Sequence, residues 1–172
     1  KNLTVVIPTI NEDPDTLTGI VRELESHGAE VIVVDDGSET PYPKSIKHGF
    51  NSGYGGAILT GIRNATHPII MTMDGDGQHS VSEAVKLYKA WKLMDCDMLV
   101  GARKLHKEYL YRYLGRKVLN TIASLLASYW INDLNSGLRI FKKDIVWGYR
   151  SILCHQFSFT TSLTMSMLCD KY

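Results

Sequence analysis

The feature that most constrains the fold is the alternation of short apolar runs with helix-like segments along the first hundred residues. The runs are rich in β-branched residues and apolar nearly throughout: "LTVVIP" from Leu3, "EVIVV" from Glu30, "PIIMTM" from Pro68 and "DMLV" from Asp97. Such runs are typical of strands that are buried on both faces of a sheet. Because strands separated by helices pair in parallel, we expect an α/β fold with a mostly parallel central sheet and helices on both faces.

Local signals place the helices between these strands. Asp13 followed by Pro14 predicts a helix start, and Gly28 predicts its end. Ser80 followed by Glu83 forms a capping-box pattern, which predicts a second helix from there to Met94.

Polar residues follow each predicted strand at the point where the strand ends. They lie in four segments, residues 9–12, 35–38, 74–78 and 101–103. In open α/β sheets ligands bind outside the carboxyl ends of the strands. We therefore expect one pocket to collect these segments.

Asp74 and Asp76 are the most informative pair, because two carboxylates one residue apart repel each other unless a cation joins them. Gly75 and Gly77 permit unusual backbone angles and a close approach by a bulky ligand. Mg²⁺ or Mn²⁺ commonly takes one or two carboxylates together with phosphate oxygens and water. The pattern fits a metal-bridged diphosphate, and a solvated turn is the alternative for the same residues.

A second acidic pair, Asp35 and Asp36, follows the second strand, where an acidic residue often binds ribose or a base edge. A plain turn role for Asp36 is the alternative. Glu12 and Asn11 follow the first strand and could bind a nucleobase. No G-x-G-x-x-G follows that strand, which disfavours a Rossmann dinucleotide site, and "NSGYGGAILTG" lacks the Lys-Ser/Thr of a P-loop.

After residue 103 the pattern changes to one long amphipathic segment, residues 110–131. Seven apolar residues form a stripe at helical spacing: Leu110, Leu114, Val118, Ile122, Leu125, Leu126 and Tyr129. Arg112, Arg116 and Lys117 lie near its start. We expect the stripe to be buried on the core, and the alternative is a helix that lies on a membrane surface.

Bulk properties are those of an ordinary globular domain. The 172 residues are enough for one domain, and the net charge of +1 argues against nucleic acid as a partner. Three cysteines without metal-ligand spacing favour a reduced, cytoplasmic setting. The longest apolar run is too short to span a bilayer. None of these properties indicates an oligomeric state.

Six motifs occur in the order seen in family-2 glycosyltransferases of the GT-A fold: "VVIPTINE", "VIVVDDGS", "NSGYGGAILTGI", "MTMDGDGQH", "VGAR" and "DLNSGLRIF". From Leu3 to Lys143 the chain resembles this family, nearest the branch of dolichyl-phosphate mannose synthase and polyprenyl-phosphate hexosyltransferases. The resemblance implies a single catalytic domain over residues 1–172. Further family segments, including any membrane helices, would follow Tyr172.

The resemblance also implies a role for each matching residue. Asp74, Asp76 and Gln78 match the D-x-D-x-Q motif that holds Mg²⁺ or Mn²⁺ and, through it, the donor diphosphate. The matches for binding of the nucleotide-sugar donor are Pro8, Thr9, Glu12, Val34, Asp36, Met73, Asp74 and Arg103. The matches for binding of the acceptor phosphate are Arg103, Arg116, Ser136 and Arg139.

The implied function is an inverting, metal-dependent transfer of a hexose from a UDP- or GDP-linked sugar. Thr160, Thr161 and Ser162 stand where many relatives carry an acidic residue. A polyprenyl phosphate is already anionic at neutral pH and needs no general base. We therefore expect a lipid-phosphate acceptor at the cytoplasmic face of a membrane. The alternatives are a sugar hydroxyl acceptor, with Asp133 as the base, and a non-catalytic nucleotide-sugar-binding module.

Overall fold

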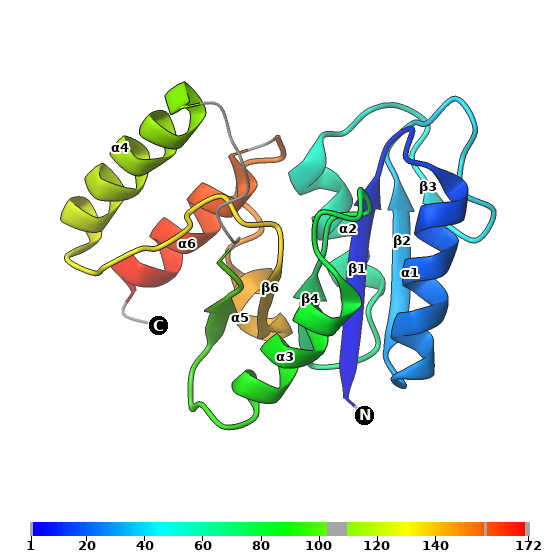
Figure 1. Ribbon diagram of the computed structural model, residues 1–172, viewed down its shortest axis with the longest axis horizontal. Helices are drawn as coiled ribbons and strands as arrows, with labels where there is room; N and C mark the ends of the chain where they lie inside the picture. Colours follow the sequence, from blue (N-terminus) through cyan, green and yellow to red (C-terminus); the bar gives the residue numbers. More distant parts are fainter. Residues whose placement is uncertain (1, 103–109, 157, 171–172) are drawn as a thin grey trace.

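The computed structural model describes residues 2–102, 110–156 and 158–170, and gives only the backbone of residues 110–114 and 116. A six-stranded sheet forms the centre, with the strand order β3-β2-β1-β4-β6-β5 (Figure 1). The strands are β1 (Leu3–Thr9), β2 (Glu30–Asp35), β3 (Ile46–Lys47), β4 (Ile69–Thr72), β5 (Met98–Val100) and β6 (Arg139–Lys142).

The sheet is mostly parallel, as expected. β1 pairs in parallel with β2 and β4, and β2 pairs in parallel with β3. β6 runs antiparallel to both of its neighbours, β4 and β5. The pairing of Thr72 with Arg139 brings the segment before β6 beside the carboxyl end of β4, where the "DGDGQ" loop begins.

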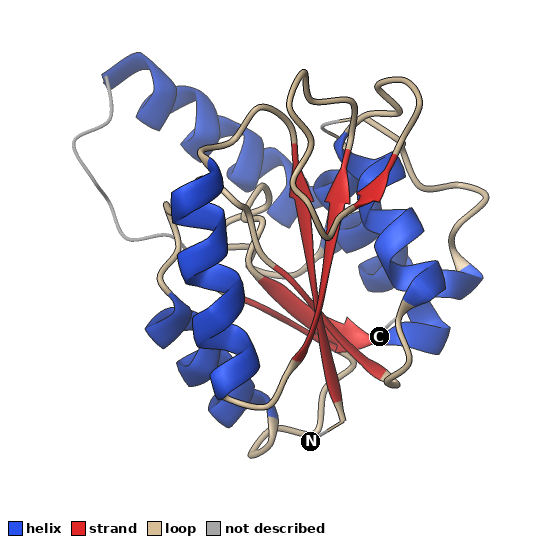
Figure 2. Ribbon diagram, turned by 90° about the vertical axis from the view of Figure 1, so that its right-hand side faces the viewer, coloured by secondary structure: helices blue, strands red, loops and turns tan. Residues whose placement is uncertain are grey.

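Helices cover both faces of the sheet (Figure 2). The helices are α1 (Pro14–Ser26), α2 (Tyr54–Asn64), α3 (Val81–Trp91), α4 (Leu110–Ala127), α5 (Lys143–Gly148) and α6 (Phe159–Cys169). Leu17 and Ala84 belong to one apolar cluster, which α1 and α3 form with one face. Ile58, Val146 and Leu163 belong to a second, which α2, α5 and α6 form with the other.

The predicted helix signals are present. The Asp13 side chain accepts a hydrogen bond from the Thr16 N–H at 2.8 Å, and Gly28 has a φ of 76° just after α1 ends. Ser80 and Glu83 form a reciprocal capping box at the start of α3. α3 ends at Trp91, three residues before the expected Met94.

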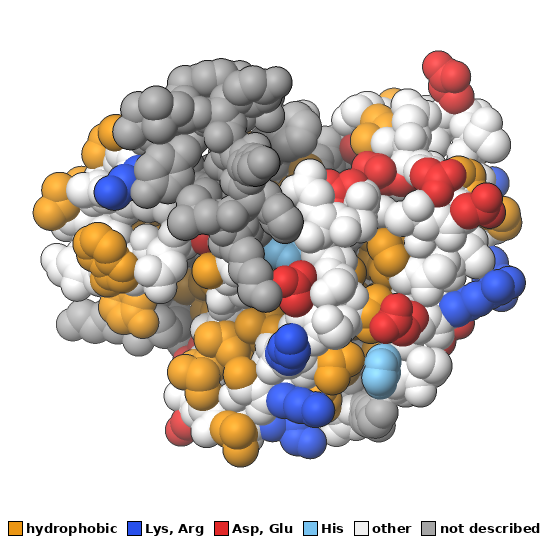
Figure 3. Space-filling model, viewed as in Figure 1, with side chains coloured by type: hydrophobic (Ala, Val, Ile, Leu, Met, Phe, Trp, Pro, Cys, Tyr) orange, Lys and Arg blue, Asp and Glu red, His pale blue; other side chains and the backbone are white. Residues whose placement is uncertain are grey.

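The five stripe residues whose side chains are described are exposed, so the expectation that they pack on the core is wrong, and the side chains of Leu110 and Leu114 lie outside the described residues. Val118, Ile122, Leu125, Leu126 and Tyr129 expose 58%, 51%, 75%, 74% and 64% of their surface. In Figure 3 apolar side chains accordingly gather over α4, at the left of the view. The physical reason is that α4 lies outside the two layers of helices.

The described apolar contact between α4 and the rest of the molecule is made by small side chains. α4 packs on α6 through Ala123 and the half-buried Ala127, with Ile131 and Leu134 following the helix. Within the described part of the chain, no helix combines the length and apolar content that a bilayer-spanning segment needs.

Candidate active site

A cleft of about 750 Å³ opens at the carboxyl ends of β1, β2 and β4. Its walls come from the loops after these strands, the first turn of α2, and the segments around α4 and α6. The lining residues are Pro8, Thr9, Ile10, Glu12, Asp36, Asn51, Gly53, Tyr54, Ala57, Asp74, Gly75, Asp76, Leu119, Asn135, Gly137, Gln156, Ser158, Thr160 and Thr161. Three of the four polar segments predicted to converge, residues 9–12, 35–38 and 74–78, therefore do so. Of the fourth, residues 101–103, neither Gly101 nor Ala102 lines the cleft.

Three carboxylates, those of Glu12, Asp74 and Asp76, lie close together on this wall. Partial burial raises the pKa of Glu12, and the charges of Asp76 and Asp74 raise it further. The crowding shows that the cleft has a negative potential at this point. Such an arrangement is stabilised by a bound cation.

The donor set fits Mg²⁺ or Mn²⁺ with an open coordination shell. Asp74 and Asp76 offer hard oxygen ligands, and Gly77 between Asp76 and Gln78 has a φ of 76° that permits the tight turn. The described residues contain no group of three or more His, Cys, Asp or Glu side chains placed to hold a metal. A metal here would thus keep positions for phosphate oxygens and water, as Mg²⁺ commonly does.

Asp74 is held from two sides. The Tyr54 hydroxyl donates to Asp74 Oδ1 at 3.0 Å, from the first residue of α2. Burial and the Asp74 carboxylate raise the pKa of Tyr54 well above its usual value of 10, so the phenol stays protonated and donates. On the other side, a Cβ at Gly137 would overlap the Asp74 carboxylate. The backbone before β6 therefore packs directly against this carboxylate.

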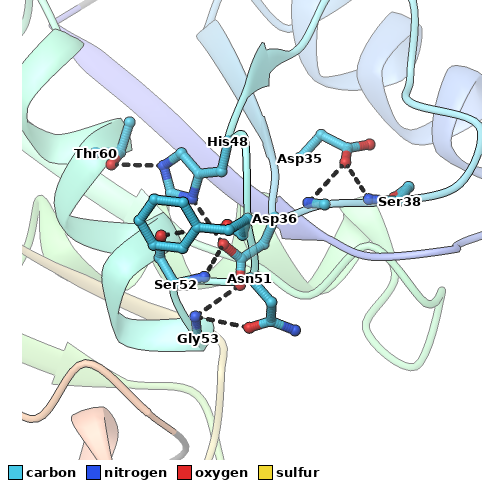
Figure 4. A network of polar contacts seen from close by, with 10 residues as sticks. Asp35, Asp36, Ser38, His48, Asn51, Ser52, Gly53 and Thr60 are labelled. Carbon is cyan, nitrogen blue, oxygen red and sulfur yellow. Dashed lines mark hydrogen bonds and ion pairs between the residues drawn. The ribbon is translucent and has the colours of Figure 1, made fainter.

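The two acidic residues after β2 have separate roles. Asp35 holds the turn that follows, with Oδ1 accepting from the Gly37 and Ser38 N–H groups at 3.2 and 2.8 Å. Asp36 lies in the cleft and points away from this turn, toward His48 and the loop before α2 (Figure 4). Asp35 therefore stabilises a turn, whereas Asp36 lines the cleft.

The other residues predicted to bind the donor fall into two groups. Pro8, Thr9 and Glu12 line the cleft. Val34 and Met73 are fully buried and are not among the lining residues. Their side chains pack in the core beneath the strand ends, and a donor-binding role for these two stays a prediction.

The residues predicted to bind the acceptor phosphate are partly buried within the chain. The Ser136 hydroxyl donates to the Gly101 carbonyl. Arg139 is 1% exposed and donates from Nε to the Ser136 carbonyl at 2.7 Å and from Nη1 to the Thr164 hydroxyl at 2.6 Å. Neither residue lines the cleft, so in this structure they hold the loop before β6, and their acceptor-binding role stays a prediction.

Two further predicted residues lie away from the cleft wall. Asp133, the predicted base, is 7% exposed, and its Oδ1 accepts a hydrogen bond from the Asn135 N–H at 3.3 Å. Gln78 is exposed, and its N–H donates to Asp76 Oδ1 at 2.9 Å. Arg103 and the side chain of Arg116 lie outside the described residues.

The sequence reasoning missed several residues of the cleft. Tyr54 and Asn51 stand in the glycine-rich segment, where the glycines suggest phosphate binding but no pattern marks these two side chains. Gln156 and Ser158 precede α6 and carry no motif that would have marked them. Thr160 and Thr161, noted only as a departure from the family pattern, line the cleft.

A comparison with protein-family models identifies the family. The model described as glycosyl transferase family 2 matches residues 4–150. The chain belongs to glycosyltransferase family 2. The matched range includes Glu12, Asp36, Asp74 and Asp76, the acidic residues in the described lining of the cleft.

Among the family's curated members, three relatives illustrate the range of similarity. An uncharacterised protein of Methanocaldococcus jannaschii is 34% identical over 80% of this chain and 63% of its own length. The UDP-N-acetylglucosamine–dolichyl-phosphate N-acetylglucosaminyltransferase of Methanococcus voltae is 31% identical over 83% of this chain and 70% of its own length. The undecaprenyl-phosphate 4-deoxy-4-formamido-L-arabinose transferase of Pectobacterium carotovorum is 27% identical over 92% of this chain and 53% of its own length.

Solved structures show the fold. Glucosyl-3-phosphoglycerate synthase from Mycobacterium tuberculosis, in complex with UDP, superposes with a TM-score of 0.76 at 13% identity, covering 99% of this chain and 66% of that one. The same enzyme with Mn²⁺, UDP and glucosyl-3-phosphoglycerate gives a TM-score of 0.75 at 14% identity, with the same coverage. The family-2 domain described above therefore has the GT-A fold.

Proposed function

We propose that this chain carries the catalytic site of an inverting, metal-dependent hexosyltransferase. The donor is a UDP- or GDP-linked sugar, and the acceptor is a polyprenyl phosphate at a membrane surface. The names of two relatives, with dolichyl phosphate and undecaprenyl phosphate as acceptors, support the acceptor class. The complexes of the mycobacterial structures with UDP and Mn²⁺ support the donor class and the metal.

The donor half of the cleft suits a nucleoside diphosphate. Glu12 and Asp36 offer hydrogen-bond acceptors for a base or ribose at the ends of β1 and β2. The N-cap and the first residue of α2, Gly53 and Tyr54, also line the cleft. A divalent cation held by Asp74 and Asp76 would supply Lewis-acid stabilisation of the charge on the departing diphosphate.

The main support for a phosphate acceptor comes from the residues in the acceptor half of the cleft. Its described lining residues are Leu119, Asn135, Gly137, Gln156, Ser158, Thr160 and Thr161, none of which can act as a general base near neutral pH. A hydroxyl acceptor would need such a base. A phosphate monoester, with a second pKa of about 6, is already a nucleophile at pH 7.

Helix α4 connects this half of the cleft to an apolar surface. Leu119 lines the cleft, while Leu125, Leu126 and Trp130 are 75%, 74% and 73% exposed farther along the same segment. Lys117 stands about two helical turns before Leu125, where its charge suits anionic headgroups. A lipid chain could therefore leave the cleft along α4 toward the membrane.

An inverting displacement fits the division of the cleft into two halves. The acceptor would approach from the α4 and α6 side, while Asp74 and Asp76 would hold the diphosphate. Displacement from the face opposite the leaving group inverts the anomeric centre, through an oxocarbenium-like transition state. The chain's role is then to orient both substrates and to exclude water.

The test uses the full-length protein with Mn²⁺ and a labelled nucleotide sugar. A short polyprenyl phosphate is supplied in one reaction, and the matching polyprenol or a soluble glycan in others. We expect transfer to the phosphate, with the anomeric configuration inverted in the product. Transfer only to the hydroxyl acceptors would refute the lipid-phosphate proposal, and binding of the nucleotide sugar without any transfer would indicate a non-catalytic module.

A further inference from the structure

The Asp36 carboxylate is almost fully used by the chain itself. Oδ1 accepts from His48 Nδ1 at 2.7 Å and from the Ser52 N–H at 2.8 Å, and Oδ2 accepts from the Gly53 N–H at 2.8 Å (Figure 4). Two of its partners are thus backbone groups of the loop that enters α2. Carboxylate oxygens have about four acceptor positions in total, so Oδ2 keeps one for a ligand.

The loop that Asp36 holds needs this support. Gly53 is the N-cap of α2 with a φ of 84°, and no side chain caps the helix from that position. Asp36 satisfies the N–H groups just before the helix and places a negative charge at its N-terminus. Asn51, Gly53 and Tyr54 of this segment all line the cleft.

Among the described residues, His48 is the only one whose side chain donates a hydrogen bond to Asp36. The side chains of His48 and Asp36 are 14% and 7% exposed, so the pair is shielded from water. The other ring nitrogen, Nε2, lies 2.9 Å from the Thr60 hydroxyl, one turn and a half into α2. His48 therefore clamps Asp36 to α2, although it is not itself a lining residue of the cleft.

We propose that His48 is a positioning residue of the donor site. Its Nδ1–H fixes the rotamer of Asp36, so that the remaining position on Oδ2 faces the nucleotide while the loop 51–53 keeps its shape. This inference rests on the proposed function, because it concerns the affinity for the nucleotide part of the donor. In this proposal His48 maintains the geometry of the donor site without touching the nucleotide.

The two ring nitrogens can be tested separately. An Asn side chain places its amide N–H₂ near the position of Nδ1, and a Gln side chain places it near that of Nε2. His48→Asn therefore keeps the donor to Asp36, whereas His48→Gln and His48→Leu remove it. Loss of a hydrogen bond to a buried charge should weaken binding roughly ten- to a hundredfold.

The measurement is calorimetry of UDP and GDP, each with Mn²⁺, on the full-length variants. We expect His48→Gln and His48→Leu to raise Kd by roughly tenfold or more, and His48→Asn to stay within about threefold of the parent. In turnover, the KM for the donor should rise in the same order with little change in kcat. If His48 acted through packing alone, His48→Asn and His48→Gln would change the nucleotide affinity to a similar extent.

His67 provides a matched control. Its Nδ1 lies 3.1 Å from Glu30 Oε2, so it also pairs with a carboxylate, but at the start of β2 and far from the cleft. His67→Leu should leave nucleotide affinity unchanged. If the parent binds neither nucleotide, the proposed function fails and this inference fails with it. If the parent binds a nucleotide and His48→Gln and His48→Asn bind it with equal affinity, only the inference about His48 is overturned. If His48→Leu does not fold, the comparison of His48→Gln with His48→Asn still tests the inference.

Discussion

At the scale of single residues, the acidic wall of the cleft decides what can bind. Partial burial raises the pKa of Glu12, and repulsion by the charges of Asp76 and Asp74 raises it further. A ligand that brings a cation relieves this repulsion. A bare anion would increase it.

We expect Asp76→Asn to abolish the metal dependence of nucleotide binding, because it removes one of two hard oxygen charges. Calorimetry of UDP or GDP with and without Mn²⁺ should show an affinity loss of roughly tenfold or more, confined to the metal-containing titration. Asp95→Asn, an exposed acid after α3, is the control. A variant that binds the nucleotide as tightly as the parent does in the presence of Mn²⁺ would contradict the metal-bridge role.

Tyr54→Phe tests the support of Asp74. The variant loses the hydroxyl that donates to Oδ1 but keeps the ring that packs at the start of α2. A net loss of about 0.5–1.5 kcal/mol should weaken Mn²⁺-dependent nucleotide binding by roughly two- to tenfold. Tyr88→Phe on α3 is the matched control. Unchanged affinity in Tyr54→Phe would show that Asp74 needs no help to keep its rotamer.

At the scale of elements, α4 is unusual because its apolar stripe faces outward. Leu119 of the same helix lines the acceptor half of the cleft. Ile122, Leu125 and Leu126 follow it along the helix and are exposed. This arrangement suits the lipid acceptor proposed above.

The double variant Leu125→Ser, Leu126→Ser should reduce binding of the full-length protein to vesicles of anionic lipid. The two side chains are 75% and 74% exposed, so the melting temperature should change little. Leu93→Ser, at a leucine 89% exposed after α3, removes similar apolar surface elsewhere and is the control. Equal vesicle binding by the parent and the double variant would exclude the stripe as the lipid-facing surface.

Glu30 joins three elements at the opposite end of the sheet. Burial alone would raise its pKa, but hydrogen bonds from Thr4, Thr66 and His67 outweigh that effect and lower the pKa below 4.5. An acid with a lowered folded-state pKa stabilises the fold above its unfolded pKa, and this contribution is lost as the pH falls through the folded value. The junction should therefore weaken in acid.

Glu30→Gln should accordingly lower the melting temperature at pH 7, while the difference from the parent should shrink below about pH 4.5. Thermal unfolding of both proteins between pH 3 and pH 7 measures this. Glu25→Gln, an exposed acid on α1, should show no such trend. A difference that stays constant over the whole range would mean that the charge of Glu30 does not contribute.

At the scale of the whole molecule, the site depends on segments that are far apart in the chain. The Thr72 hydroxyl donates to the Gly137 carbonyl at 2.7 Å, across 65 residues of sequence. This contact, together with the antiparallel pairing of β6, places Gly137 against Asp74. The metal-binding carboxylate and the loop before β6 therefore form one unit.

Gly137→Ala should disrupt this unit, because the added Cβ would overlap the Asp74 carboxylate. We expect the loss of Mn²⁺-dependent nucleotide binding and a fall in stability of roughly 1–3 kcal/mol. Gly19→Ala is the matched control, since nothing lies within 4 Å of its added Cβ and alanine favours the helix α1. Full metal-dependent binding in Gly137→Ala would show that Asp74 can move aside.

The sequence by itself determined the α/β class, the helix starts at Asp13 and Ser80, and the convergence of Glu12, Asp36, Asp74 and Asp76 on one cleft. These follow from local physics: β-branched runs form buried strands, capping side chains start helices, and parallel strands present their carboxyl ends at one edge. The order of the six motifs indicated the glycosyltransferase family. No long-range contact had to be known for any of these results.

Only the tertiary structure decided which partner each polar group has. Asp35 holds a turn, Asp36 pairs with His48, and the buried side chain of Arg139, the first residue of β6, donates to the loop before that strand. The tertiary structure also left the stripe of α4 exposed, because periodicity shows that a helix has an apolar face but not what that face will meet. Such outcomes depend on contacts between residues far apart in the chain, and a local pattern carries no information about them.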